Sequence, residues 1–335
     1  MAFDPLGSAE PQDTHPTCPG HALHGHNGHE HGGQCGCHHD HDHDPGHDHD
    51  PGHDHGHDHG HEHLRPPKYK PGILLAAFGV AIDEARRGYD LFEAEVRQRH
   101  PDMELAWAYT AHKVRRKLNR RGKECDSLAV ALSRLHDKGV THLAVQSLHT
   151  TPGVEYHWTR EQSLVYVHPR KGFPEVVVGG PLLLSDLDLD RSCQALRGYI
   201  PAERRPDQAV VLVGHGTYHH GQQRYLDFQE RVQRDDPLIR VGTLMGRPAC
   251  RDIMAELEAN GVKDVWLLPF MCVPGHHVHL DVLGNTPNSW KSQMEHAGFT
   301  VRGCVTGTLE HAPFRTIWLE HLDAACAHIR ALETA

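Results

Sequence analysis

Short apolar runs alternate with longer amphipathic stretches along most of this chain. The runs are bounded by Gly, Pro or polar clusters, which is typical of strands buried on both faces, and they occur at 73–79, 103–110 and 141–148 and near 175–179, 209–213, 239–244 and 263–269. Apolar residues recur at helical spacing over 83–99, from His112, over 127–139, and near 220–233 and 311–331. This alternation predicts an α/β protein with parallel sheets flanked by helices.

The strand predicted at 209–216, AVVLVGHG, has a counterpart earlier in the chain. Residues 72–79, GILLAAFG, read the same way, with Phe78 where the later copy has His215. A histidine between two glycines at the end of a buried strand lies where ligands bind in parallel α/β folds. The paired segments indicate an internal duplication, and therefore two similar lobes.

A longer pair of segments supports the duplication. Residues 134–157 align without a gap with 256–279, so that Gly139 matches Gly261 and Glu155 matches His277. We predict three parts: a His/Asp-rich tail at 1–70, an N-terminal α/β lobe at 71–205 and a C-terminal α/β lobe at 206–335. Leu64–Pro67 closes the tail.

The duplication places polar groups at corresponding strand ends. His215, Glu155 and His277 are each predicted at a carboxyl edge, and two imidazoles with a carboxylate can form a site for a divalent metal ion. Each has another interpretation: His215 as a helix cap, Glu155 as an acid at a helix N-terminus, and His277 as only one of three histidines in GHHVH. The repeat alignment favours His277 over His276 and His279.

Further polar groups are candidates for ligand binding. His149 ends the strand predicted at 141–148, where it would line the same cleft. Arg116 and Arg120 lie four residues apart in a basic run, so they share a helix face that is either solvated or a clamp for a polycarboxylate ligand. His219 and His220, just past His215, are expected at the surface or behind the site.

The N-terminal tail has a composition unlike the rest. From His21 to His63, 17 of 43 residues are histidine, and most of the others are Asp or Gly. With so few apolar side chains we expect it to be disordered. Imidazoles spaced two apart can bind Co²⁺, Ni²⁺, Zn²⁺ or Cu²⁺, although an inert acidic linker is the other interpretation. The predicted tail ligands are His41, His43, His47, His49, His53, His55, His57 and His59.

Charge and composition exclude several function classes. Residues 1–63 hold 12 Asp/Glu and no Lys or Arg, so the formal charge of −10 belongs to the tail and the remainder is close to neutral. A broad nucleic-acid-binding surface is therefore not expected. No 18-residue apolar run predicts a membrane span, and no GxxxxGK[ST] or GxGxxG predicts a nucleotide. Nine mostly scattered cysteines favour reduced thiols and a cytoplasmic location.

From about Gly72 to the end, the chain resembles the class II sirohydrochlorin cobalt chelatases of the anaerobic cobalamin pathway, which are relatives of ferrochelatase. The matching pieces, in order, are LLAAFG, RRKL, AVQSLH with GVEY, GHG with a following HH, and PGHH before Ser289-Trp290. The resemblance implies that Glu155, His215 and His277 are the metal and catalytic residues. One position departs from the family pattern: where the family has an acidic residue before the last histidine, this chain has His276.

The resemblance implies an enzyme that inserts Co²⁺ into sirohydrochlorin without ATP and releases two protons. Imidazoles would hold the metal and accept protons, a carboxylate would balance charge, and basic groups would face the carboxylates of the ring. Insertion of Fe²⁺ or Ni²⁺ is an alternative. Sites with nitrogen and oxygen ligands follow general trends in metal affinity, and cells override these trends by controlling metal supply. A metal-storage protein or metallochaperone is another. A homo-oligomer is compatible with the sequence.

Overall fold

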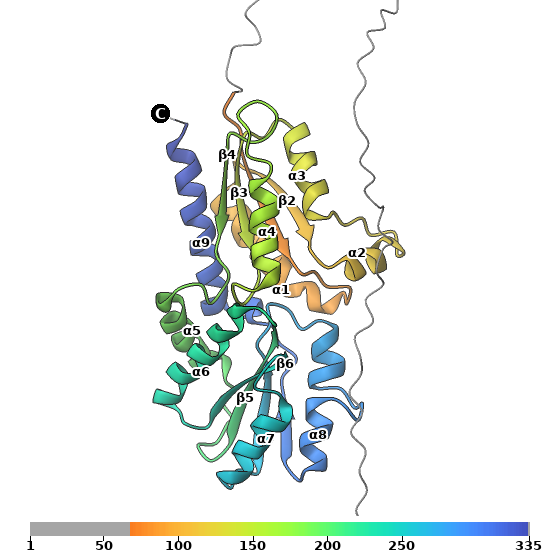
Figure 1. Cartoon of the computed structure of the whole chain (residues 1–335), viewed down its shortest axis with the longest axis vertical. Helices are drawn as coiled ribbons and strands as arrows, with labels where there is room; N and C mark the ends of the chain where they lie inside the picture. The colour runs from red at the N-terminus through yellow and green to blue at the C-terminus, as the bar shows by residue number, and fades with distance from the viewer. Residues whose placement is uncertain (1–67, 334–335) are drawn as a thin grey trace, which may run out of the picture. The chain divides into compact units, whose positions relative to one another are not determined.

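The computed structural model describes residues 68–333, which form two four-stranded sheets (Figure 1). The predicted tail ligands lie outside these residues. In the first sheet the strand order is β2-β1-β3-β4, and in the second it is β6-β5-β7-β8. All pairs are parallel, as the apolar runs predicted. The strands are β1 Pro71–Ala77, β2 Glu104–Tyr109, β3 His142–Ser147, β4 Glu175–Gly179, β5 Ala209–Gly216, β6 Ile239–Met245, β7 Asp264–Pro269 and β8 Thr300–Gly303.

The two sheets repeat each other strand for strand. β1 lies between β2 and β3 in the first sheet, and β5 lies between β6 and β7 in the second. Gly139 and Gly261, which the repeat alignment matched, both adopt positive φ, at +80° and +69°, after helices α3 and α7. A glycine at this place ends a helix at little steric cost. The α/β fold with two similar lobes is therefore confirmed.

Helices cover both faces of the sheets. They are α1 Arg87–Arg99, α2 His112–Asn119, α3 Leu128–Asp137, α4 Val154–Leu164, α5 Asp186–Tyr199, α6 Gln223–Asp235, α7 Cys250–Ala259, α8 Trp290–His296 and α9 Ala312–Ala331. Four shorter turns complete the set: η2 Glu84–Arg86, η3 His220–Gln222, the π-helical η4 Val278–Val282 and η5 Thr308–Glu310.

The hydrophobic pattern did not single out some of these elements. α5 begins with a capping box in which Ser185 and Asp188 satisfy each other's backbone N–H groups, a local signal that does not depend on apolar periodicity. β8 has only four residues and is largely exposed, so no apolar run marks it. α4 starts directly after Gly153 and has a mostly polar sequence.

One core cluster joins the two sheets. It includes Leu75 of β1, Leu212 of β5, Phe270 after β7 and Trp318 of α9, all essentially inaccessible to solvent. The last helix, α9, packs against β3 and β4 of the first sheet (Figure 1). Both sheets thus share apolar contacts, and the end of the chain covers the sheet formed by its beginning. The boundary proposed at 205/206 separates the strands of the two sheets, and as a division into lobes it stays a prediction.

Candidate active site

The three predicted site residues follow strands β5, β7 and β3. His215 lies at the end of β5, and His277, in the helical turn after β7, is the N-cap residue of η4. Glu155 is in the first turn of α4, the helix after β3. β3 and β7 occupy equivalent places in their sheets. Each residue therefore lies at or beyond the carboxyl end of a strand, where parallel sheets bind ligands.

Backbone packing requires the glycines beside His215. Gly216 has φ +78°, and a Cβ there would lie 1.8 Å from the carbonyl oxygen of Met245. A Cβ on Gly214 would lie 2.5 Å from the ring of Tyr225. Only glycine fits both places, so β5 can pass close to its neighbours and still present an imidazole at its end.

Both histidines have one ring nitrogen engaged. His277 Nδ1 lies 2.7 Å from the Asp281 carboxylate, and His215 Nδ1 lies 3.1 Å from the Gly216 carbonyl oxygen. A carbonyl or an ionised carboxylate only accepts hydrogen bonds, so each Nδ1 carries the proton. In a neutral ring with this hydrogen bond, Nε2 is the nitrogen with the free lone pair. This is the tautomer that binds metal, with the far nitrogen oriented by an oxygen.

The two imidazoles lie close together in a partly desolvated place. The ring centroids of His215 and His277 are 5.0 Å apart, and Phe78 packs 5.9 Å from His215. Burial lowers the pKa of His215 and nearby His277 acts in the same direction, while Glu155 and Asp281 oppose them. His215 is therefore neutral at pH 7 and able to coordinate a cation. Phe78, its counterpart in the repeat, forms an apolar wall.

Glu155 acts electrostatically on His215, but the three groups are not tightly gathered. Among the described residues, the three metal-ligating side chains whose donor atoms all lie within 4.8 Å of one another are instead His157, His219 and His220. The first two of these are partly buried. Sequence reasoning missed His157 altogether and expected the other two at the surface or behind the site. The role of Glu155 as a ligand stays a prediction.

His149 lies deeper than the sequence indicated. Its Nδ1 is 2.7 Å from the Ser147 hydroxyl, and its Nε2 is buried without a hydrogen-bond partner among the described residues. Burial lowers its pKa to about 4. A neutral imidazole cannot attract a ligand carboxylate by charge, so any substrate contact through His149 would be a neutral hydrogen bond.

The basic run at 113–123 divides into two kinds of residue. Some bind the protein: Arg115 donates to the Thr110 carbonyl at 2.8 Å, and Lys123 lies 2.7 Å from Asp83. The side chains of Arg116 and Arg120 are exposed and have no hydrogen bond or ion pair within residues 68–333. Exposed and unpaired side chains fit both interpretations, a solvated helix face and a clamp for a carboxylate ligand, so the role of Arg116 and Arg120 in substrate binding stays a prediction.

Two features near His277 were not predicted. Asp281 lies four residues after it, one turn along, and this His-x-x-x-Asp spacing was visible in the sequence. A cavity of about 430 Å³ opens beside both residues and is also lined by Arg251, Asn288 and Gln293. These side chains come from α7 and α8 and from the segment between η4 and α8, so only the fold brings them together.

Comparisons with known proteins identify the family of the chain. The family model described as Cobalt chelatase (CbiK) matches residues 71–327. The chain is 40% identical over 259 residues to a protein of Nitratidesulfovibrio vulgaris named sirohydrochlorin cobaltochelatase CbiKC, covering 77% of this chain and 92% of that one. It is 32% identical over 261 residues to the sirohydrochlorin cobaltochelatase of Salmonella typhimurium, covering 76% and 96%.

A solved structure has the same fold. SirB from Bacillus subtilis with Fe³⁺ superposes with a TM-score of 0.54 at 14% identity, over 78% of this chain and 98% of that one. At this identity the likeness concerns the fold alone. The family match spans both sheets and the candidate site, and two relatives exceed 30% identity over most of their length. The chain belongs to the cobalt chelatase (CbiK) family.

Proposed function

We propose that this protein is a sirohydrochlorin cobaltochelatase, an enzyme that inserts Co²⁺ into sirohydrochlorin. The observation that carries the proposal is the pair of facing imidazoles, His215 and His277, whose Nδ1 atoms are both held by oxygen acceptors. Two family relatives are named for this activity.

The reaction exchanges two protons for one metal ion. Two pyrrole nitrogens lose their protons as Co²⁺ binds them, so the products are cobalt-sirohydrochlorin and two H⁺. His215 and His277 would hold the incoming Co²⁺ through Nε2 while its other coordination positions stay open to the ring nitrogens. Once the metal has moved to the ring, the freed imidazoles can accept the pyrrole protons.

The carboxylates compensate charge in this scheme. Asp281 bonds to His277 Nδ1 and stabilises the ring both as a ligand and when it is protonated. Glu155 favours positive charge at His215. Together they offset the charge of a divalent ion held in a site that burial makes unfavourable for cations.

Binding of the ring would use cations on both halves of the protein. The side chains of Arg116 and Arg120, in the α2 region, make no hydrogen bond or ion pair within residues 68–333, and Arg251 lines the cavity beside His277. Sirohydrochlorin carries carboxylates around its edge, so guanidinium groups are suited to it. No nucleotide-binding motif occurs in the sequence, which supports insertion without ATP.

The decisive experiment measures insertion into sirohydrochlorin with Co²⁺, Fe²⁺ and Ni²⁺ in parallel. We expect turnover with Co²⁺ to have the highest kcat/KM, and we expect His215→Ala to abolish it while the far-ultraviolet spectrum stays unchanged. Faster turnover with Fe²⁺ or Ni²⁺ would reassign the metal. Metal binding without consumption of sirohydrochlorin would indicate a storage or delivery protein instead.

A further inference from the structure

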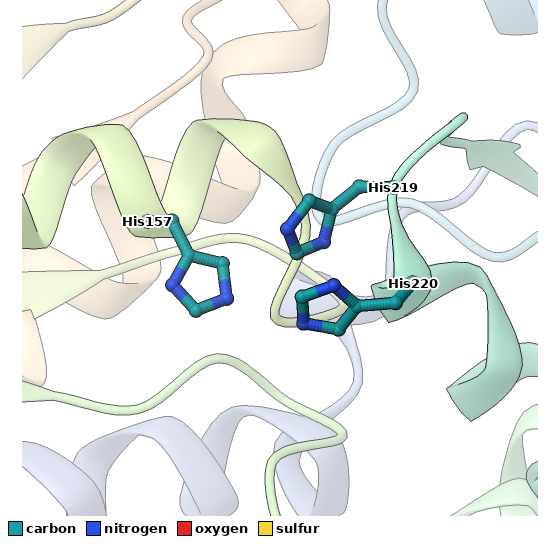
Figure 2. A group of neighbouring side chains, drawn as sticks. All are labelled: His157, His219 and His220. Carbon is teal, nitrogen blue, oxygen red and sulfur yellow. The ribbon is translucent and has the colours of Figure 1, made fainter.

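His157, His219 and His220 form a second cluster of metal-binding side chains, separate from the pair His215 and His277 (Figure 2). Their ring centroids are 4.9 Å apart for His157 and His219, and 5.8 Å for His157 and His220. The His219 and His220 rings lie 3.6 Å apart. Figure 2 shows ring nitrogens of all three turned toward a common space.

The cluster joins the two halves of the fold. His157 projects from α4, which follows β3 of the first sheet, whereas His219 and His220 follow β5 of the second. The backbones already meet here, because a Cβ on Gly221 would lie 2.4 Å from the Pro152 carbonyl oxygen. A group bound by all three rings would therefore connect segments that are about 60 residues apart in sequence.

One ring nitrogen of His157, Nε2, is buried without a hydrogen-bond partner among the described residues. Buried polar atoms are almost always satisfied by protein, water or an ion, so an orphan aimed at two other imidazoles indicates a missing ligand. His220 is exposed, and its ring likewise has no hydrogen bond in the described part.

His219 is held by a main-chain hydrogen bond that it must exchange for a metal ion. Its Nδ1 accepts a hydrogen bond from the Gly221 backbone N–H at 3.1 Å, so the proton of the neutral ring is on Nε2, and the ring also interacts with the Pro152 carbonyl. Coordination through Nδ1 replaces the Gly221 N–H directly, and coordination through Nε2 moves the proton to Nδ1, so either mode gives up this one hydrogen bond. A carbonyl oxygen commonly accepts the N–H of the other ring nitrogen in a metal-bound histidine. Burial and the two neighbouring imidazoles lower the pKa of His219, which favours the neutral form.

We propose that His157, His219 and His220 form a second divalent-metal site, independent of His215 and His277, that cross-links α4 to the segment after β5. Three neutral imidazoles select borderline ions such as Co²⁺, Ni²⁺ or Zn²⁺ over Mg²⁺ or Ca²⁺. Bonds of about 2.0–2.1 Å in a tetrahedral arrangement would bring the nitrogens to roughly 3.3 Å from one another. The ion thus draws the rings closer than their present 4.8 Å limit.

The site can be observed directly by anomalous diffraction. Crystals of the full-length protein grown with Co²⁺ would be measured on both sides of the cobalt absorption edge. We expect a peak among the three rings in the wild type and none in His157→Ala or in His220→Ala, which alters an exposed side chain. A wild-type map without this peak at saturating Co²⁺ would overturn the proposal. So would a peak that persists in both variants.

The same map separates this proposal from the proposed function. The occupancy beside His215 and His277 is measured independently, so either site can fail alone. If the peak beside His215 and His277 is retained in His157→Ala, the variant folds and still binds cobalt.

A solution measurement tests the cross-link. Ligands that bind only the folded state raise the unfolding midpoint, so Co²⁺ should stabilise the wild type more than His157→Ala. The matched control is His296→Ala, an exposed histidine at the end of α8. We expect the control to keep the full Co²⁺-dependent shift, and the apparent affinity to fall at least about tenfold in His157→Ala. Equal shifts in all three proteins would refute the cross-link.

Discussion

At the scale of single residues, the candidate site depends on how the surroundings set the charge of each group. His215 and His149 both follow predicted strands, and burial lowers the pKa of each. Yet His215 has a second imidazole 5.0 Å away between ring centroids, whereas His149 is held by the Ser147 hydroxyl. Two histidines that looked similar in sequence therefore have different chemistry available to them.

Glu155→Gln tests whether the carboxylate in the first turn of α4 takes part in the reaction. The change keeps volume and hydrogen bonding but removes the charge that favours a cation at His215. We expect the insertion rate to fall by at least about tenfold, the scale of one lost acid–base group. Glu161→Gln, at an exposed place on the same helix, is the matched control. An unaltered rate at saturating Co²⁺ would make Glu155 only a helix-end acid.

His149 should make the stability of the protein depend on pH. Its pKa is about 4 in the folded protein, against 6.5 for an unperturbed histidine, so the unfolded chain binds the proton more tightly. Stability is then greatest above pH 6.5 and falls as the pH drops toward 4, by roughly 3 kcal/mol from this group. Urea unfolding at several pH values should show a flatter dependence for His149→Phe. An equal slope in both proteins would contradict the assignment.

At the scale of elements, the π-helical turn η4 and the residues leading into it decide how His277 is presented. His277 and Asp281 are four residues apart, and the turn places their side chains in contact at 2.7 Å. The carboxylate fixes the ring tautomer, which neither residue could do alone. The hydrophobic pattern did not single out this turn, although its Val278 and Val282 are both fully buried.

Asp281→Asn should weaken the metal site without removing a ligand. An amide holds the His277 ring less firmly and does not balance its charge. We expect the KM for free Co²⁺, set by a metal buffer, to rise about 10- to 100-fold with a smaller change in kcat. Asp137→Asn, at the exposed end of α3, is the control. A KM equal to that of the wild type would show that Asp281 is a surface carboxylate without a role.

The region of α2 should contribute to binding the ring. The side chains of Arg116 and Arg120 have no hydrogen bond or ion pair in the part of the chain that the structure describes. Replacing both with Gln should raise the KM for sirohydrochlorin more than it lowers kcat, because peripheral carboxylates are bound alike in the ground and transition states. Lys113→Gln with Lys117→Gln removes two exposed charges of the same helix for comparison. If the KM for sirohydrochlorin stays constant, Arg116 and Arg120 belong to a solvated face.

At the scale of the whole molecule, duplication explains why a site forms between the sheets. Each half carries the same strand order, and equivalent places carry different groups: Phe78 against His215, and Glu155 against His277. Phe78 packs against His215. Duplication followed by divergence thus yields two imidazoles on one half and a carboxylate on the other.

None of the helices in residues 68–333 combines the length and the apolar character that a membrane span requires.

Deleting residues 1–63 should separate metal collection from catalysis. Every proposed active-site group lies beyond Gly72, so turnover at saturating Co²⁺ should stay close to that of the full chain. The number of bound divalent ions should fall sharply, and insertion should slow when Co²⁺ is limiting. Metal stoichiometry and initial rates of both proteins measure this. Identical rates at limiting Co²⁺ would show an inert linker, and lost activity at saturation would show a misplaced boundary.

The sequence alone determined the parallel sheets, the duplication and the place of His215 at the end of a strand, because buried strands and glycine-bounded turns have local sequence patterns. It also placed Glu155 and His277 in matching segments that follow strands. It also determined the family, through an ordered series of short motifs. Only the tertiary structure decided which groups meet. The contact of His277 with Asp281 and the burial of His149 depend on packing around them. The meeting of His157 with His219 and His220 depends on how α4 of one half approaches the segment after β5 of the other, and residues some 60 positions apart give no local sign of it.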